Sequence, residues 1–296
     1  MTEFKHTVTI EDEGLEVRDI VRSYFDFSSR LRNRIKREKL TLQNGAQTEG
    51  WYKVKAGDVI SITLPEEESH FPPQEIPLDI IYEDDDLMII NKQPDLVVHP
   101  TKGHPDNTVA NALSYYMEQT GIKWKIRFVN RLDMDTSGLL LVAKNAYCQN
   151  EITKQMKQNL IRKEYTAIVS GFIDEESGTV DLPIGRPDPD DVRRGVMEGG
   201  APSVTHYSVA ERLNDYTVIN LVLETGRTHQ IRVHMSHIGH PIAGDHLYGG
   251  LNDAVIKRQA LHAARLSFIH PISGKDVTFT APLPDDMKAA ILKCRK

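Results

Sequence analysis

One segment of the chain places an acidic side chain among residues that typically form a turn between strands. Asp133 lies within the string NRLDMDTSG, residues 130–138, just before the apolar run LLLVAK. An ionised carboxylate in such a loop can act as a nucleophile or a general base, as carboxylates do in glycosyl chemistry. The string DTSG is also an ordinary turn sequence, and Asp133 would equally suit a salt bridge to a nearby arginine. The residues alone leave both interpretations open.

Two later segments carry the other candidates for chemistry. In KEYTAIV, Tyr165 and Ala167 share one face of an expected strand, so Tyr165 is at first sight a packed core side chain whose hydroxyl has one partner. In ETGRTHQIRVH, Gly226 allows a tight turn from strand to helix. Arg227 stands at the expected helix start, where exposed N–H groups already favour an anion. Arg227 is therefore a candidate partner for a negatively charged group.

A group of histidines in and after the third segment raises the possibility of a metal site. They are His229, His234, His237, His240 and His246. Their spacing does not match the HExxH helix pattern, and a thiolate or acidic partner at ligand spacing is lacking. The sequence also has no phosphate-binding P-loop and no dinucleotide-binding glycine pattern. We therefore expect neither a metal nor a cofactor.

Short strands and helices must position these side chains from residue 78 onward. The periodicity predicts two strands around an acidic turn in 78–92, helices over 108–117 and 145–159, a strand–loop–strand unit over 128–144, strands over 163–171 and 216–226, and a helix from Thr228 ended by Gly239. Several consecutive strands are joined without a long helix. This favours an α+β fold whose central sheet is mixed, largely antiparallel and flanked by helices.

The first 65 residues have a different character. Apolar residues at helical spacing precede Ser28, which is a plausible N-cap for a second helix, and an Asn44-Gly45 turn and an alternating strand follow. The second helix carries six positive charges between residues 30 and 39 against one acid: Arg30, Arg32, Arg34, Lys36, Arg37 and Lys39 against Glu38. Such a run is either a solvated helix face or a surface for a polyanion. We expect a small α/β unit over 1–65, a Pro- and acid-rich linker over 66–77 and a larger domain over 78–296.

Length and composition limit the kind of protein. The chain has 296 residues, a formal net charge of −6 and two cysteines, Cys148 and Cys294. A disulfide framework is excluded, which favours a reducing compartment. The first fifteen residues lack the apolar core of a secretory signal, and no apolar run approaches the ~20 residues of a membrane helix. We expect a cytoplasmic protein that contacts no membrane and needs no obligate protein partner.

Taken together, the three chemical segments resemble the pseudouridine synthases of the RluA/RluD type. That family's signature is HRLDxxTSGLLLVAK, then a KxY strand, then LxTGRTHQIRVHMxxxGHPIxGDxxYG. This sequence has RLDMDTSGLLLVAK, RKEYTAIV and LETGRTHQIRVHMSHIGHPIAGDHLYG, and the likeness extends from about Leu78 to Pro282. It implies that the C1′–N1 bond of a uridine in RNA breaks and that a C1′–C5 bond replaces it, without a cofactor.

The resemblance also implies a role for each site residue. Asp133 would be the catalytic carboxylate, with Arg227 beside it to keep it ionised. Tyr165 would pack under the pyrimidine and could accept the C5 proton. Arg131 would occupy the position that the flipped-out uridine vacates, and Leu261 would line the uracil pocket. Whether Asp133 attacks C1′, attacks C6 or removes a ribose proton stays open.

The first 65 residues resemble a degenerate S4 domain, a small RNA-binding module. On this basis the candidate RNA contacts of the basic helix are Arg30, Arg34, Lys36 and Arg37. An S4-like arm is more usual in the ribosomal RNA branch of the family, so large-subunit ribosomal RNA is the favoured substrate over transfer RNA. The sequence departs from the family pattern in four places, which concern target choice and loop shape: Asn130, Gln93, Asp95 and Gly200.

Three alternatives stay open from the residues. The first is a non-catalytic RNA-binding or ribosome-assembly protein that keeps the fold, and the second is a synthase that acts on transfer RNA. The third is a glycosylase that releases free base, which is disfavoured because nothing near Asp133 indicates a second, water-activating carboxylate.

Overall fold

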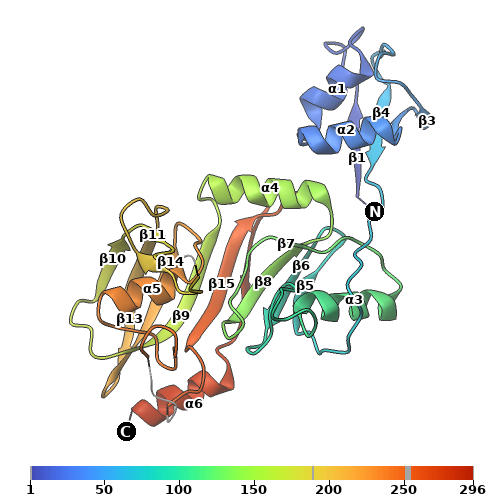
Figure 1. Cartoon of the computed structure of the whole chain (residues 1–296). Coiled ribbons are helices and arrows are strands. Elements are labelled where there is room, and N and C mark those ends of the chain that lie inside the picture. Colours follow the sequence, from blue (N-terminus) through green and yellow to red (C-terminus); the bar gives the residue numbers. More distant parts are fainter. Residues whose placement is uncertain (1, 189, 251–254, 296) are drawn as a thin grey trace.

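The computed structural model describes residues 2–188, 190–250 and 255–295, which form a small N-terminal unit above a larger domain (Figure 1). The N-terminal unit consists of a four-stranded sheet with two helices. The larger domain is built on a ten-stranded sheet, and a separate two-stranded sheet, β11 (Ile184–Gly185) with β12 (Gly195–Val196), lies beside it.

The N-terminal unit has its own hydrophobic core. Its elements, in chain order, are β1 (Glu3–Thr7), α1 (Val17–Tyr24), α2 (Ser29–Arg37), β2 (Thr41–Gln43), β3 (Ala46–Gln47) and β4 (Val59–Thr63). The predicted N-cap of the basic helix is confirmed, because the Ser28 hydroxyl accepts a hydrogen bond from the Leu31 N–H at 3.3 Å. Strand β1, which pairs antiparallel with β4, was not predicted. No helix or strand lies between residues 64 and 79, the range that includes the predicted linker.

The large sheet has the strand order β10-β13-β14-β9-β15-β8-β6-β5, with β16 beside β15 and β7 beside β8. Within the described residues, β15 and β8 are the one parallel pair, so the predicted mixed, largely antiparallel sheet is confirmed. The strand bounds are β5 (Ile80–Glu83), β6 (Leu87–Lys92), β7 (Arg127–Phe128), β8 (Ser137–Ala143), β9 (Arg162–Ser170), β10 (Ser177–Asp181), β13 (Val204–Arg212), β14 (Tyr216–Leu223), β15 (Leu261–Ile269) and β16 (Asp276–Thr280).

Strand β8 lies at the centre of the domain and is buried on both faces. Leu140 and Val142 belong to one hydrophobic cluster, and Leu139 and Leu141 belong to another. The strand therefore shows a continuous apolar run instead of an alternating pattern. At its start, Gly138 has φ 107°, and a Cβ there would lie 2.3 Å from the Ala263 carbonyl oxygen. Only glycine permits this approach of β8 to β15, which fixes the end of the loop that carries Asp133.

Four helices of the larger domain complete the fold: α3 (Val109–Thr120), α4 (Ala146–Lys157), α5 (Gln230–His237) and α6 (Asp285–Cys294). The side chains of Thr108 and Asn145 cap α3 and α4, whose starts lie one residue after the starts predicted at 108 and 145. Helix α5 begins two residues later than predicted, because His229 adopts a left-handed conformation with φ 58° at its N-cap. Helix α6 was not predicted.

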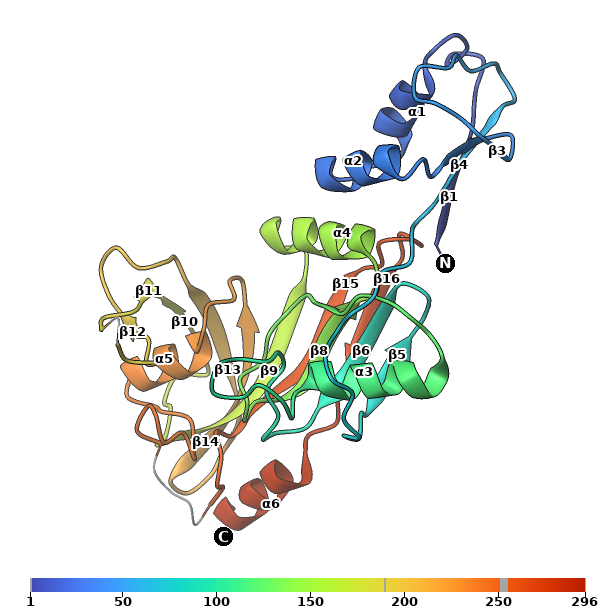
Figure 2. The same cartoon turned by 45° about the vertical axis from the view of Figure 1, so that its right-hand side comes forward.

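The N-terminal unit packs against the end of the larger domain near α4 (Figure 2). The Tyr147 ring of α4 contacts both Phe4 and Phe27, with centroids 4.7 and 5.8 Å apart in edge-on geometry. Lys154 forms an ion pair with Asp26 at 2.7 Å. These contacts place the basic helix α2 on the side of the unit that faces the larger domain.

Candidate active site

The loop between β7 and β8 presents Asp133, and a buried lysine holds this loop in place. Lys92, at the end of β6, is only 1% exposed. Its ammonium group donates to the carbonyl oxygens of Gln93, Leu96 and Met134 at 2.8 to 2.9 Å. Burial lowers the pKa of Lys92 to about 7. The three hydrogen bonds tie the residue next to Asp133 to the core of the sheet.

The partner of the Asp133 carboxylate is Arg232 of α5. The Nη1 of Arg232 donates to Asp133 Oδ2 at 2.8 Å. Its Nε and Nη2 form a bidentate salt bridge with Asp245, at 2.7 and 2.9 Å. Asp245 is 1% exposed. Burial opposes the charge of Arg232, but the hydrogen bonds and charges of Asp245 and Asp133 raise its pKa overall. Arg232 is thus a permanent cation shared between a buried carboxylate and the candidate catalytic one.

The prediction that Arg227 pairs with Asp133 is wrong. The Arg227 Nε donates to the Pro202 carbonyl oxygen at 3.1 Å, and its backbone N–H donates to the Gln230 side chain at 3.0 Å. Arg227 precedes α5 and lies in the connection from β14. The side chain that reaches Asp133 is that of Arg232, in the first turn of α5. The sequence contained one indication of Arg232, since this arginine lies between the apolar Ile231 and Val233 and needs a carboxylate partner once the segment is buried.

A small cavity of about 60 Å³ brings the predicted site residues together. Tyr165 on β9 and Leu261 at the start of β15 are both buried, and Tyr165 is paired in register with Ala263 of β15. Burial and, to a smaller extent, the Asp133 carboxylate raise the pKa of Tyr165, so its phenol is protonated near neutral pH. The cavity is lined by Arg131, Leu132, Asp133, Thr136, Tyr165, Leu223, Arg227, His229, Gln230, Ile231, Arg232 and Leu261.

His229, next to Asp133, and its partner Tyr248 were not predicted as residues of this site. His229 Nε2 lies 3.8 Å from Asp133 Oδ2, and His229 Nδ1 lies 2.9 Å from the Tyr248 hydroxyl. That hydroxyl also accepts the backbone N–H of Arg194 at 2.8 Å. Burial lowers the pKa of His229, although the Asp133 carboxylate acts in the opposite direction. The ring is therefore mainly neutral at pH 7. His229 is the N-cap residue of α5 and has a left-handed backbone conformation, with φ 58°.

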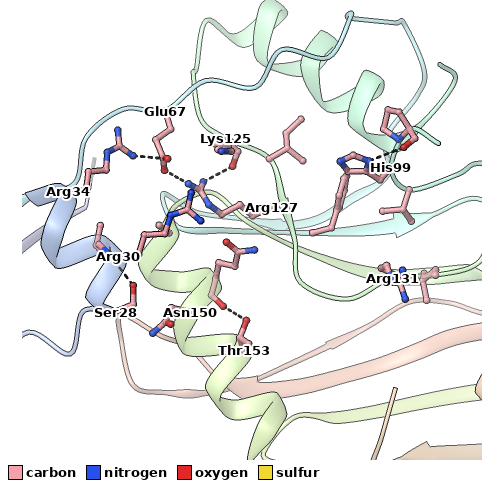
Figure 3. A pocket seen from close by; sticks show the side chains of 18 of the residues that line it. Ser28, Arg30, Arg34, Glu67, His99, Lys125, Arg127, Arg131, Asn150 and Thr153 are labelled. Atoms are coloured by element: carbon pink, nitrogen blue, oxygen red, sulfur yellow. Dashed lines mark hydrogen bonds and ion pairs between the residues drawn. The ribbon is translucent and has the colours of Figure 1, made fainter. Parts of the chain in front are cut away.

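A groove of about 1520 Å³ runs from the N-terminal unit to Asp133 (Figure 3). Three predicted RNA contacts of α2 line it, namely Arg30, Arg34 and Arg37, whereas Lys36 is exposed elsewhere on the helix. Arg131 lines both the groove and the small cavity, at the junction of the two. The cationic lining residues are Arg30, Arg34, Arg37, Lys125, Arg127 and Arg131, and the acidic ones are Glu38, Glu67 and Asp133.

Glu67 joins the two sides of this groove. One carboxylate oxygen accepts from Arg34 of α2 at 2.7 Å, and the other accepts from Arg127 at the start of β7 (Figure 3). Arg127 is buried, and its Nη1 also donates to the Lys125 carbonyl oxygen at 2.9 Å. The bridge fixes the distance between the basic helix and the loop that leads to Asp133.

Of the histidines considered as metal ligands, His229 contacts Asp133 and Tyr248, and His234 has a different environment. The His234 ring is buried between the Thr205 hydroxyl and the Leu182 carbonyl oxygen, at 2.9 and 3.0 Å. In residues 2–188, 190–250 and 255–295, no cluster of three His, Cys, Asp or Glu side chains is arranged to hold a metal ion. Over the same ranges, no helix is long and apolar enough to cross a membrane.

Comparison with known proteins agrees with this geometry. A model of the RNA pseudouridylate synthase family matches residues 86–237. The uncharacterized RNA pseudouridine synthase YjbO of Bacillus subtilis (strain 168) is 43% identical over 250 residues, which cover 84% of this chain and 88% of that protein. Ribosomal large subunit pseudouridine synthase D of Escherichia coli (strain K12) is 45% identical over 249 residues, covering 79% and 76%.

A solved structure shows the same fold. Human RNA pseudouridylate synthase domain containing 1 superposes with a TM-score of 0.61 at 29% identity, over 74% of this chain and 89% of that one. The matched family model includes Asp133, Tyr165, Arg227 and Arg232, and the relatives are similar over most of both chains. The chain therefore belongs to the RluA/RluD-type RNA pseudouridine synthases, the isomerases that its three chemical segments indicate.

Proposed function

We propose that this protein converts uridines of large-subunit ribosomal RNA to pseudouridine, with Asp133 as the catalytic carboxylate. The observation that carries the proposal is the Asp133–Arg232 ion pair of 2.8 Å at the cavity over Tyr165. The ribosomal target is supported by relatives named ribosomal large subunit pseudouridine synthase D, which are similar over most of this chain.

The free oxygen of Asp133 suits this chemistry. Arg232 engages Oδ2, and among the described residues Oδ1 has no hydrogen-bond partner. An oriented, ionised carboxylate with one open oxygen can act on the sugar or on the base of a bound uridine. In the reaction, the C1′–N1 bond breaks, the uracil turns and C1′–C5 forms, after which C5 loses its proton to a base and N1 takes up a proton, so the product is an isomer of the substrate. Because its pKa is raised, Tyr165 enters this sequence as a neutral phenol that can support the pyrimidine face. A neutral phenol is a weak base, so the other role expected from the resemblance, acceptance of the C5 proton, does not fit Tyr165.

The target uridine must leave the RNA stack to reach this cavity. Flipping a nucleotide costs a few kcal/mol, and the cost is smallest in loops. Arg131 is exposed at the mouth of the cavity, where its Nη2 lies 3.3 Å from the Thr228 hydroxyl. This position supports the role assigned to Arg131, which is to fill the vacated place in the RNA and contact phosphates.

The groove supplies a path for the flanking RNA. We propose that residues 1–65 act as an S4-like RNA-binding domain, joined by a linker over 66–77 to the catalytic domain over 78–296. Arg30 and Arg37 face the groove and would contact phosphates. Removing one cation that binds a phosphate should reduce the slope of log affinity against log salt by about 1. We expect this change for Arg30→Ala and Arg37→Ala but not for the matched control Lys36→Ala.

The direct test of the chemistry measures tritium released from C5-labelled uridine in ribosomal RNA. Asp133→Ala should abolish release and leave RNA affinity within about tenfold, roughly 1.4 kcal/mol. Turnover close to that of the wild type would remove Asp133 from the mechanism. For the target, pseudouridine mapping in a strain that lacks the protein should show the loss of specific large-subunit positions. A loss confined to transfer RNA would contradict the ribosomal assignment.

A further inference from the structure

Two aromatic side chains lie exposed on the N-terminal unit, outside the active site. Trp51 is 62% exposed and Tyr52 is 47% exposed, in the turn between β3 and β4. Their rings stack on one another with centroids 4.2 Å apart and an interplanar angle of 25°. Large aromatic groups normally dominate cores and interfaces, so an exposed stacked pair requires an explanation.

The backbone around the two rings is firmly anchored. The Tyr52 carbonyl oxygen accepts the Val17 N–H at 2.9 Å, and the Gly50 carbonyl oxygen accepts the Arg18 N–H at 2.9 Å. Both bonds tie the turn to the start of α1. The Tyr52 N–H closes the turn on the Glu49 carbonyl oxygen at 3.1 Å. The backbone that carries the two rings is therefore fixed before any ligand arrives, which lowers the entropic cost of binding one.

The charge around the pair favours an anionic ligand. Residues 50–57 include two exposed lysines, Lys53 and Lys55, and no acidic residue, and the adjacent Glu49 is paired with Lys39 at 3.1 Å. The nearby Arg18 side chain is also largely exposed, with Glu16 as its ion-pair partner at 2.7 Å. An aromatic surface beside cations is the combination that binds single-stranded nucleic acid, because bases stack on the rings while cations meet the phosphates.

We propose that Trp51 and Tyr52 form a stacking platform for an unpaired base of the RNA substrate, separate from the groove that leads to Asp133. Neither residue lines that groove. Their turn is bonded to α1, and Figures 1 and 2 both show α1 farther from the larger domain than α2. The proposal rests on the proposed RNA-binding role of residues 1–65. It adds that the enzyme binds a second unpaired nucleotide of the RNA, distant from the target uridine.

Tryptophan fluorescence tests the platform in the full-length protein. The chain has two tryptophans, and Trp124 is 5% exposed. The difference in emission between wild type and Trp51→Phe therefore isolates the Trp51 signal. We expect single-stranded oligouridylate to quench that signal and a blunt duplex of equal length to leave it unchanged. Equal quenching by both RNAs, or by neither, would overturn the platform.

A binding measurement gives an independent check. Base–aromatic stacking corresponds to about 5-fold to about 150-fold in affinity. Trp51→Ala should weaken binding of a large-subunit ribosomal RNA fragment within this range, and Trp51→Phe should keep most of the affinity because a stacking ring remains. Ile10→Ala, at an 84% exposed apolar residue of the same unit, is the matched control and should change neither affinity nor tritium release.

Two further outcomes would contradict this inference and leave the proposed function standing. One is wild-type affinity in the Trp51→Ala protein. The other is a dimer that Trp51→Ala dissociates in size-exclusion chromatography, which would assign the rings to a contact between two copies. Conversely, a protein whose Trp51 is quenched by RNA but which releases no tritium would contradict the proposed function and not the platform.

Discussion

The two arginines of the third segment provide the most direct test of the site. Arg232 pairs with Asp133 and the buried Asp245, whereas Arg227 donates to the Pro202 carbonyl oxygen and, through its backbone N–H, to the Gln230 side chain. Removal of one partner from a buried pair leaves an uncompensated charge and costs about 3–5 kcal/mol. Arg232→Ala should therefore lower the free energy of unfolding by this amount, because the buried Asp245 loses its bidentate salt bridge.

The matched variant Arg227→Ala should behave differently. It removes one hydrogen bond to the Pro202 carbonyl oxygen, which is worth about 1 kcal/mol. Urea denaturation gives the two unfolding free energies, and tritium release under conditions where both proteins are folded gives their activities. We expect Arg232→Ala to lose most of its turnover because Asp133 loses its orienting hydrogen bond.

The Asp245→Asn variant separates catalysis from stability. It removes the buried charge and leaves Arg232 in place to pair with Asp133, so turnover should exceed that of Arg232→Ala. The reasoning would be refuted if Arg227→Ala destabilised the protein as strongly as Arg232→Ala, or if Arg232→Ala kept wild-type turnover.

Three other features give further predictions. Glu67→Gln removes the charge that pairs with both Arg34 of α2 and Arg127 of β7. Affinity for a ribosomal RNA fragment should therefore fall, while turnover of a short RNA that does not reach α2 persists. An equal loss of turnover on both RNAs would contradict a role of Glu67 in setting the distance between α2 and β7. Gly138→Ala should cost several kcal/mol in urea denaturation, because its Cβ would meet the Ala263 backbone, and wild-type stability would disprove the steric argument. For Lys92, a native pKa of about 7 against 10.5 for the free side chain means that the unfolded state binds more protons between these values. Relative to Lys92→Met, the wild type should therefore gain stability as pH rises from 7 to 9, by at most about 1.4 kcal/mol per pH unit; a flat or falling difference would show that this proton is not released.

The sequence determined the features that depend on neighbouring residues. The predicted cap at Ser28 and the helix starts predicted at residues 108 and 145 lie within one residue of the observed starts, because capping is a contact within one turn. The apolar run of β8 and the polar loop before it located Asp133 between two strands. The family motifs predicted the enzyme class, because they consist of residues that one reaction requires.

Only the tertiary structure decided which side chains meet. Arg232 and Asp133 are separated by 99 positions, and the choice of Arg232 over Arg227 depends on the left-handed turn at His229, which helical periodicity does not register. The contact of His229 with Tyr248 likewise depends on two loops packing together. Charge partners are set by where whole elements dock, because a guanidinium pairs with whichever carboxylate the fold brings within about 3 Å. For that reason local patterns found the catalytic loop, but the residue that orients its carboxylate emerged only from the packing of α5 against it.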